Sequence, residues 1–180
     1  MTWLSQPTAQ GIEVASRNFA QLLMQDQLNT AIAALAAAIG NVAGATNDVS
    51  ASDGVTYDAI NTAHSLFGDR SASLVAQVMN GSMFHKLIGQ NLANGARLFQ
   101  AANVQVVDIL GRPVIVTDAP ALYVTGTPNK LKVLSLAESA AIVHDAGDVI
   151  SNVQTVNGQS RIETSMQVDY TFGLGLKGYT

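Results

Sequence analysis

The sequence predicts an α+β fold, and two observations carry most of this prediction. Apolar residues recur at helical spacing from Ile12 to Ile39, without proline or internal glycine. Apolar side chains then recur at the even positions Ile162, Met166, Val168, Tyr170, Phe172, Leu174 and Leu176, with polar residues at the odd positions from Arg161 to Thr171, which is typical of a β-strand with one wet face. Segments of both kinds lie between these two stretches. We therefore expect one long helix, a long β-hairpin and several shorter helices and strands.

The first element is the long amphipathic helix. Its apolar positions are Ile12, Ala15, Phe19, Leu23, Leu28, Ile32, Leu35 and Ile39. Gly40 supplies a stop, and at ~1.5 Å per residue the helix would be roughly 40 Å long. A rod of that length exceeds what a compact small lobe usually contains.

Two further helices are predicted after a loop at Asn41–Gly54. Thr56 is a plausible N-cap, with Asp58 in the first turn, for a helix that ends at Gly68. Its expected buried stripe is Ala59, Ile60, Ala63, Leu66 and Phe67. Leu74–Met79 then forms a short strand, and a turn at Asn80-Gly81-Ser82 opens a third helix to about Leu92. The apolar face of that helix is Met83, Phe84, Leu87, Ile88 and Leu92.

The remaining segments are β-rich. Gly111-Arg112 joins two predicted strands at Val104–Leu110 and Pro113–Thr117, and Pro120, Gly126 and Pro128 mark an irregular stretch. Further strands are expected at Lys130–Ala137, Ala140–His144 and Val149–Val156. Asn157-Gly158, directly before the long alternating strand, is a strong hairpin signal.

Composition indicates self-association. Hydrophobic residues make up 48% of the chain and charged residues 12%, about half the roughly 25% of ordinary soluble domains. A neutral surface of this kind favours contact with other protein. The net charge of −4, with nine scattered basic residues, argues against tight binding to nucleic acid.

The sequence gives few indications of where the protein is located. The absence of cysteine excludes disulfides and fits a reducing cytoplasm. No signal peptide begins the chain, and no apolar run reaches the ~18 residues of a membrane span.

Residues that could carry chemistry do not form a convincing site. His64, His85 and His144 lie on separate elements without a ligand pair at helical spacing. Gly173–Gly178 fits the pattern GxGxxG, but no helix follows to bind a pyrophosphate, so close packing of another backbone is the better interpretation. Ser71 and Ser73 near Asp69, or the pair Asp108 and Asp118, lack a positioned base. We therefore predict no enzyme activity and no catalytic, cofactor-binding or metal residues.

Two segments and the order of elements resemble one protein family. The segments are Met79-Asn80-Gly81-Ser82-Met83-Phe84-His85-Lys86-Leu87 and Ile109-Leu110-Gly111-Arg112-Pro113-Val114-Ile115-Val116-Thr117-Asp118. With the long helix before them and the long hairpin after them, the chain resembles tailed-bacteriophage major capsid proteins of the HK97-like fold.

The resemblance implies a division into two domains. Residues 1–73 and 149–172 would form the peripheral (P) domain, with the spine helix and the long β-hairpin, and residues 74–148 and 173–180 the axial (A) domain, a mixed sheet flanked by helices. The family's N-terminal arm and extended E-loop have no counterpart ahead of the helix, so an N-terminally truncated capsid protein is expected.

The function implied by the resemblance is structural. The chain would self-assemble into pentamers and hexamers of an icosahedral capsid that encloses the DNA genome, assembled in the host cytoplasm and found in the virion. Its partners would be identical subunits and possible scaffold, portal and decoration proteins, with only weak non-specific contact with DNA and no membrane. An encapsulin-like compartment shell, a small α+β enzyme with a pocket of His85, Asp108 and Asp118, and a tail-tube protein remain alternatives.

Overall fold

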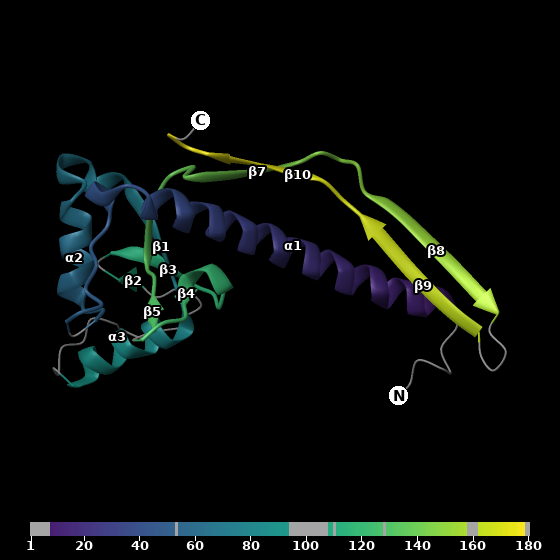
Figure 1. Ribbon diagram of the computed structural model, residues 1–180, viewed down its shortest axis with the longest axis horizontal. Helices are drawn as coiled ribbons and strands as arrows, with labels where there is room; N and C mark the ends of the chain where they lie inside the picture. The colour runs from purple at the N-terminus through teal and green to yellow at the C-terminus, as the bar shows by residue number, and fades with distance from the viewer. Residues whose placement is uncertain are drawn as a thin grey trace.

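The computed structural model describes residues 8–52, 54–93, 108–109, 111–127, 129–157 and 162–178. It combines helices and strands, so the predicted α+β class is confirmed. A body built around a small sheet lies at one end of the molecule, and a long helix and a two-stranded ribbon extend away from it (Figure 1).

The long helix α1 (Thr8–Gly40) confirms the predicted rod and extends it by one turn at the N-terminus. It is continuous because it contains no proline, and its two glycines, Gly11 and Gly40, lie in its first and last turns. Only its C-terminal third enters the core, where Ala31, Ile32, Leu35 and Ala36 are buried. The predicted apolar stripe is therefore buried at Ile32 and Leu35 but exposed at Ile12 and Leu28.

The body is organised around a four-stranded mixed sheet. Its strands are β1 (Leu74–Met79), β2 (Asp108–Ile109), β3 (Arg112–Val116) and β6 (Leu134–Ala137), in the order β2-β3-β1-β6. β1 is central, parallel to β3 and antiparallel to β6. Because successive side chains of a strand point to opposite faces, Val78 enters one hydrophobic core and Met79 the other.

The two cores cover the two faces of the sheet. The first joins the C-terminal part of α1 to the sheet and to the 3-10 helix η4 (Pro120–Leu122), with Leu122 fully buried. The second joins the sheet to α2 (Tyr57–Ser65) and α3 (Gly81–Ala93) through Ile60, Met83 and Leu87. Both helices were predicted, but α3 begins at Gly81, inside the turn Asn80-Gly81-Ser82 that was expected to precede it.

The start of α2 follows the prediction and its end does not. Thr56 is the N-cap, and its hydroxyl accepts a 3.0 Å hydrogen bond from the Ala59 N–H. The expectation that Leu66 and Phe67 belong to the buried stripe is wrong, because α2 ends at Ser65 and both side chains are exposed. His64 is buried in their place.

Two predicted strands are revised. The segment Lys130–Ala137 forms two strands, since β5 (Lys130–Leu131) pairs with β4 (Tyr123–Val124) whereas β6 pairs with β1. Between them the Lys132 N–H donates to the Leu122 carbonyl at 2.8 Å. Of the predicted strand Val104–Leu110, the described residues are Asp108 and Ile109, which pair with β3 across Gly111 at a φ of 72°. Pro128 also lies outside the described residues.

The C-terminal half of the chain forms two successive ribbons. β7 (Ala141–Asp145) pairs with β10 (Phe172–Leu176), and β8 (Ile150–Asn157) pairs with β9 (Ile162–Asp169), both antiparallel. The single long strand predicted up to Leu176 is thus broken at residues 170–171, where Asp148 accepts a hydrogen bond from the Thr171 N–H.

The predicted hairpin and its alternation are confirmed. From Met166 to Leu176 every even-numbered side chain is partly buried and every odd-numbered one is exposed. The last pair of the ladder is Asn157 with Ile162, so Asn157 ends the strand and the connection comprises residues 158–161, which lie outside the described residues.

Candidate assembly surfaces

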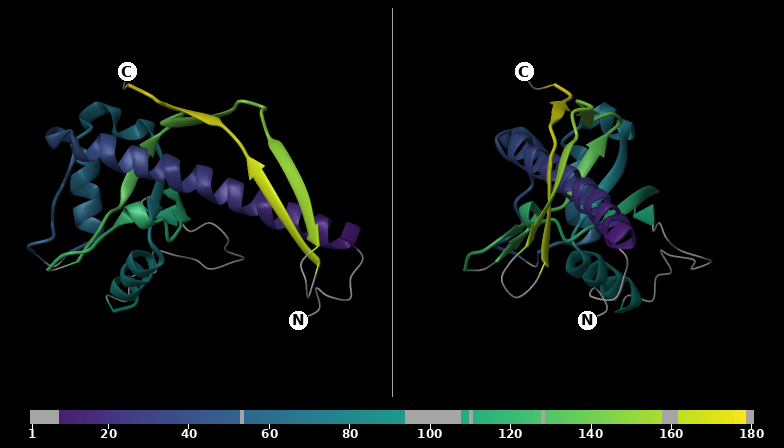
Figure 2. Two further views of the ribbon diagram at one scale, coloured as in Figure 1. Left: turned by 45° about the vertical axis from the view of Figure 1, so that its right-hand side comes forward. Right: turned by 90° about the vertical axis from the view of Figure 1, so that its right-hand side faces the viewer.

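The N-terminal part of α1 and the β8–β9 ribbon together form an arm that extends beyond the body (Figures 1 and 2). Large apolar side chains are exposed along it, namely Ile12, Val14, Leu22, Met24, Leu28, Ile150, Val153 and Val156. Isolated exposed apolar residues are ordinary on protein surfaces, but this many on one extension indicates contact with other protein.

One stripe of α1 runs from the core into solvent. Met24, Leu28 and Leu35 lie on one face of the helix, because their spacings of four and seven residues correspond to one and two turns. Leu35 is 6% exposed, whereas Leu28 is 43% and Met24 64% exposed. The body therefore covers only one end of a continuous apolar stripe.

Tyr170 joins the arm's two components. It lies between β9 and β10, and its hydroxyl donates a 2.5 Å hydrogen bond to Oδ2 of Asp26 on α1. Its ring packs edge-on against Phe19 at 5.9 Å and stacks on Phe172 at 6.2 Å between centroids. The hydrogen bond to Asp26, with smaller effects of desolvation and of the carboxylate charge, raises the pKa of Tyr170.

A groove lies beside this joint. It has a volume of about 400 Å³ and is lined by Phe19, Leu22, Leu23, Gln25, Asp26, Asn29 and Tyr170. The lining is mostly apolar, with the hydrogen-bonded Asp26 at one side. Such a groove can hold an apolar side chain from another molecule.

The β8–β9 ribbon has two chemically distinct faces. Cross-strand partners share a face, and one face carries the pairs Val153 with Met166 and Ser151 with Val168. The other face carries Asn152 with Gln167 and Gln154 with Ser165 at its centre, and Ile150 with Asp169 and Val156 with Glu163 towards its ends. Met166 and Val168 are partly covered, while the amide-rich face is exposed throughout.

In the body, Arg112 and His64 form the centre of a polar network. The Arg112 guanidinium donates to the Leu74 carbonyl at 2.6 Å, to the Ser71 carbonyl at 2.7 Å and to Nδ1 of His64 at 2.8 Å. It therefore connects β3 to α2, β1 and the 3-10 helix η3 (Gly68–Ser73). Burial, and then the charge of Arg112, lower the pKa of His64.

The hydrogen bonds fix the protonation of His64. Because Nδ1 accepts from Arg112, the neutral ring carries its proton on Nε2, which can donate to Oγ of Ser135 at 3.0 Å. The Gln77 side-chain amide lies 3.3 Å from the same Nε2. Because Nε2 carries the proton, the amide oxygen Oε1 is the atom that can accept from it. If the amide nitrogen faces Nε2 instead, Oε1 is buried without a partner.

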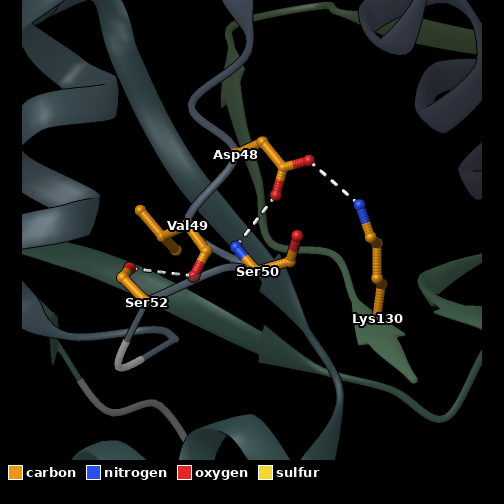
Figure 3. Close-up of polar contacts among 5 residues, drawn as sticks. All are labelled: Asp48, Val49, Ser50, Ser52 and Lys130. Carbon is orange, nitrogen blue, oxygen red and sulfur yellow. Dashed lines mark hydrogen bonds and ion pairs between the residues drawn. The ribbon is translucent and has the colours of Figure 1, made fainter. Parts of the chain in front are cut away.

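A third polar cluster fixes the loop after α1. Asp48 accepts from the Ser50 N–H at 2.9 Å and from Nζ of Lys130 on β5 at 3.0 Å, while the Ser52 hydroxyl donates to the Val49 carbonyl (Figure 3). Hydrogen bonds from Ser50, followed by the one from Lys130, hold the pKa of Asp48 well below its usual range. The cluster joins the loop after α1 to β5.

The residues singled out for possible chemistry do not converge. His64 is buried in the network above, and Ser71 enters it through its backbone carbonyl. The Ser73 hydroxyl donates to the Arg70 carbonyl at 2.7 Å, and Asp118 accepts from the Asn80 side chain at 2.9 Å at the start of α3. Within the part of the chain that the structure describes, no three His, Asp or Glu residues are grouped as metal ligands.

The glycine pattern lies on β10. Gly173 and Gly175 are exposed, and a Cβ added there would meet His144 or Ile142 atoms at 3.8–3.9 Å, which is ordinary contact. The prediction that another backbone packs closely against them is therefore wrong within this chain.

By length and composition α1 could also cross a membrane, since residues Gln10–Gly40 have a mean hydropathy of 1.2 over the most apolar window. The sequence analysis did not predict a membrane-spanning helix, because it counted only uninterrupted apolar residues. Core helices of soluble proteins can have the same length and hydropathy, so these two properties are weak evidence for a membrane span. The burial of Ile32 and Leu35 in the body accounts for the apolar C-terminal end.

The chain matches a known protein family over its whole length. The family Gp13-like, described as "Major capsid protein 13-like", matches residues 1–180. No curated protein matches the chain.

Proposed function

The chain belongs to the Gp13-like family of major capsid proteins, and from this premise we propose that it is the building subunit of an icosahedral phage capsid with the HK97-like fold. Subunits would form pentamers and hexamers that enclose the DNA genome. As a capsid protein it associates with itself and is found in the virion.

The arm carries this proposal. A helix and a ribbon that extend beyond the body, with apolar side chains exposed along both, form a surface that another subunit can cover. In a closed shell each subunit repeats the same contacts with its neighbours, so modest contact energies suffice for a stable container. The low content of charged residues, 12%, suits the close packing of many copies.

The division into the arm and the body suggests two domains. We propose that residues 1–73 and 149–172 form the P-domain, of which α1 is the spine helix and β8–β9 the long hairpin. Residues 74–148 and 173–180 would form the A-domain around the sheet β2-β3-β1-β6. The polar network of Arg112 and the two cores support a rigid body at this end of the molecule.

Weak interaction with DNA is part of the proposal. The chain has a net charge of −4 and few basic side chains to displace counterions from phosphates, so the inner surface of the capsid would enclose DNA without binding it tightly. Scaffold, portal and decoration proteins are the further partners that the proposal includes.

Electron microscopy of the expressed chain tests the proposal. Uniform round shells, with purified subunits that show little salt-sensitive DNA affinity, are the expected result. A chain that stays monomeric at high concentration and in the presence of its phage's other capsid proteins would contradict it. Shells that contain an enzyme in place of DNA would indicate the encapsulin-like alternative.

A further inference from the structure

The outer edge of β8 has none of the features that usually protect an exposed strand. Exposed edges are normally blunted by charged side chains, proline or bulges, because their free N–H and C=O groups attract another strand. The strand Ile150–Asn157 contains no charged residue and no proline, and its pairing with β9 is regular over all eight positions. Its hairpin partner β9 contains Glu163 and Asp169.

The side chains of β8 are also suited to strand pairing. Ile150, Val153, Thr155 and Val156 are β-branched, and such residues favour extended backbone. Ile150 is 67% exposed, Val156 49% and Val153 43%. Among the described strands, no other pairs with β8 besides β9.

The sequence of β8 is complementary to itself when two copies are antiparallel. With Val153 opposite Val153 of a second copy, Ile150 lies opposite Val156, an apolar pair. In the same register Ser151 lies opposite Thr155, and Asn152 opposite Gln154, so hydroxyl meets hydroxyl and amide meets amide. No charged groups face one another in this arrangement.

We propose that β8 pairs with β8 of a second copy of this chain about a two-fold axis at Val153, which makes a continuous four-stranded sheet β9-β8-β8-β9. The axis is perpendicular to the sheet, so the faces of the two ribbons stay aligned: the Val153 and Met166 faces join, and so do the amide faces. The inference rests on the proposed role as a capsid subunit and names one contact between subunits.

Single cysteine variants test the register directly, because the chain has no cysteine of its own. Opposite residues in antiparallel strands have Cα atoms ~4.5–5.5 Å apart, within the range for a disulfide. Val153→Cys should therefore form a disulfide-linked dimer on mild oxidation. Thr164→Cys, on the same face of β9, is the matched control: its copies would be at least three strand spacings, or ~14 Å, apart, and they are also offset along the strands because Thr164 pairs with Thr155.

The expected result is about tenfold more covalent dimer for Val153→Cys than for Thr164→Cys, since only the first pair lies within disulfide range. A yield no higher than that of the control would overturn the proposal.

A charge pair tests the same register without oxidation. Asn152→Lys with Gln154→Lys places like charges opposite each other across the axis, whereas Asn152→Lys with Gln154→Glu places opposite charges there. We expect the first double variant to lose the contact between copies, measured as dimer at equal concentration, and the second to keep it. Equal association of both would contradict the register.

The two proposals fail separately. Shells without a Val153→Cys cross-link would leave the capsid role intact and refute the β8 pairing. A cross-linked dimer in a chain that forms no shell under any condition tested would support the pairing and refute the capsid role.

Discussion

Tyr170 and Asp26 are 144 residues apart in sequence, yet a 2.5 Å hydrogen bond connects them. This hydrogen bond joins the chain between β9 and β10 to the exposed half of α1. Because the carboxylate stabilises the protonated phenol, Asp26→Asn should lower the pKa of Tyr170 towards 10. Titration of tyrosinate absorbance checks this, with Tyr57→Phe as a control that leaves the Tyr170 transition in place. An unchanged titration in Asp26→Asn would contradict the contact.

Arg112→Lys should destabilise the body. A lysine cannot reproduce three donors in a planar fork, so the Leu74 and Ser71 carbonyls and Nδ1 of His64 cannot all be satisfied. Since hydrogen bonds to charged groups contribute about 1.5–3 kcal/mol each, we expect a loss of about 2 kcal/mol in the free energy of unfolding, measured in urea. Arg70→Lys, at an exposed position, is the control and should have little effect.

Acidification should weaken the fold through His64. Its folded-state pKa lies below the value of 6.5, so the unfolded chain binds a proton first as the pH falls. Stability is therefore fully present above pH 6.5 and declines as the pH drops from there to the folded-state pKa. Urea unfolding at several pH values measures the slope. His64→Gln should reduce it, because the glutamine does not titrate in this range. Equal slopes in the wild type and His64→Gln would refute the assignment.

Substitution of the exposed apolar stripe should separate folding from assembly. Met24→Ser combined with Leu28→Ser removes side chains that the body does not cover, so thermal unfolding of the monomer should change little. Assembly, followed by light scattering, should be lost or strongly slowed if neighbouring subunits cover the stripe. Asn18→Ser, an exposed polar position of the same helix, is the matched control. Normal assembly of the double variant would show that the stripe stays in solvent.

The Asp48 cluster should respond more to Ser50 than to Lys130. Hydrogen bonds from Ser50 are the main reason that the pKa of Asp48 is low, and the exposed ion pair with Lys130 is screened by solvent. Ser50→Gly removes the side-chain hydrogen bond, which is the largest of these effects, and keeps the backbone N–H bond. NMR titration of the carboxyl group should therefore show a larger rise of the pKa in Ser50→Gly than in Lys130→Met. The opposite order would assign the shift to the ion pair.

The elements that sequence alone predicted well are those whose signal is local. The long helix, the Thr56 N-cap, the strand Leu74–Met79 and the alternation up to Leu176 all depend on periodicity or on capping chemistry within a few residues. The errors arose where tertiary contacts decide. Leu66 and Phe67 fit a helical stripe, but α2 ends before them, and Lys130–Ala137 is divided because its two halves pair with different strands.

The surfaces that matter for assembly were only partly predictable. The shortage of charge indicated self-association, but the apolar spacing of α1 could not show that Leu28 is exposed and Leu35 buried. That difference depends on how far the body extends along the helix. The Tyr170–Asp26 bond and the Arg112 network join residues 144 and 48 positions apart, and no local pattern signals such contacts.

Because the body buries α1 only near its C-terminal end, the rest of the helix, with the ribbon that Tyr170 joins to it, would move together as a lever. The segment ahead of Ala31 spans ~35 Å at 1.5 Å per residue. A tilt of about 10° where the helix enters the body would then displace its far end by about 6 Å, given that rise per residue. Small changes in packing around Ile32 and Leu35 can thus alter the angle between adjoining subunits, and with it the curvature of any lattice they build.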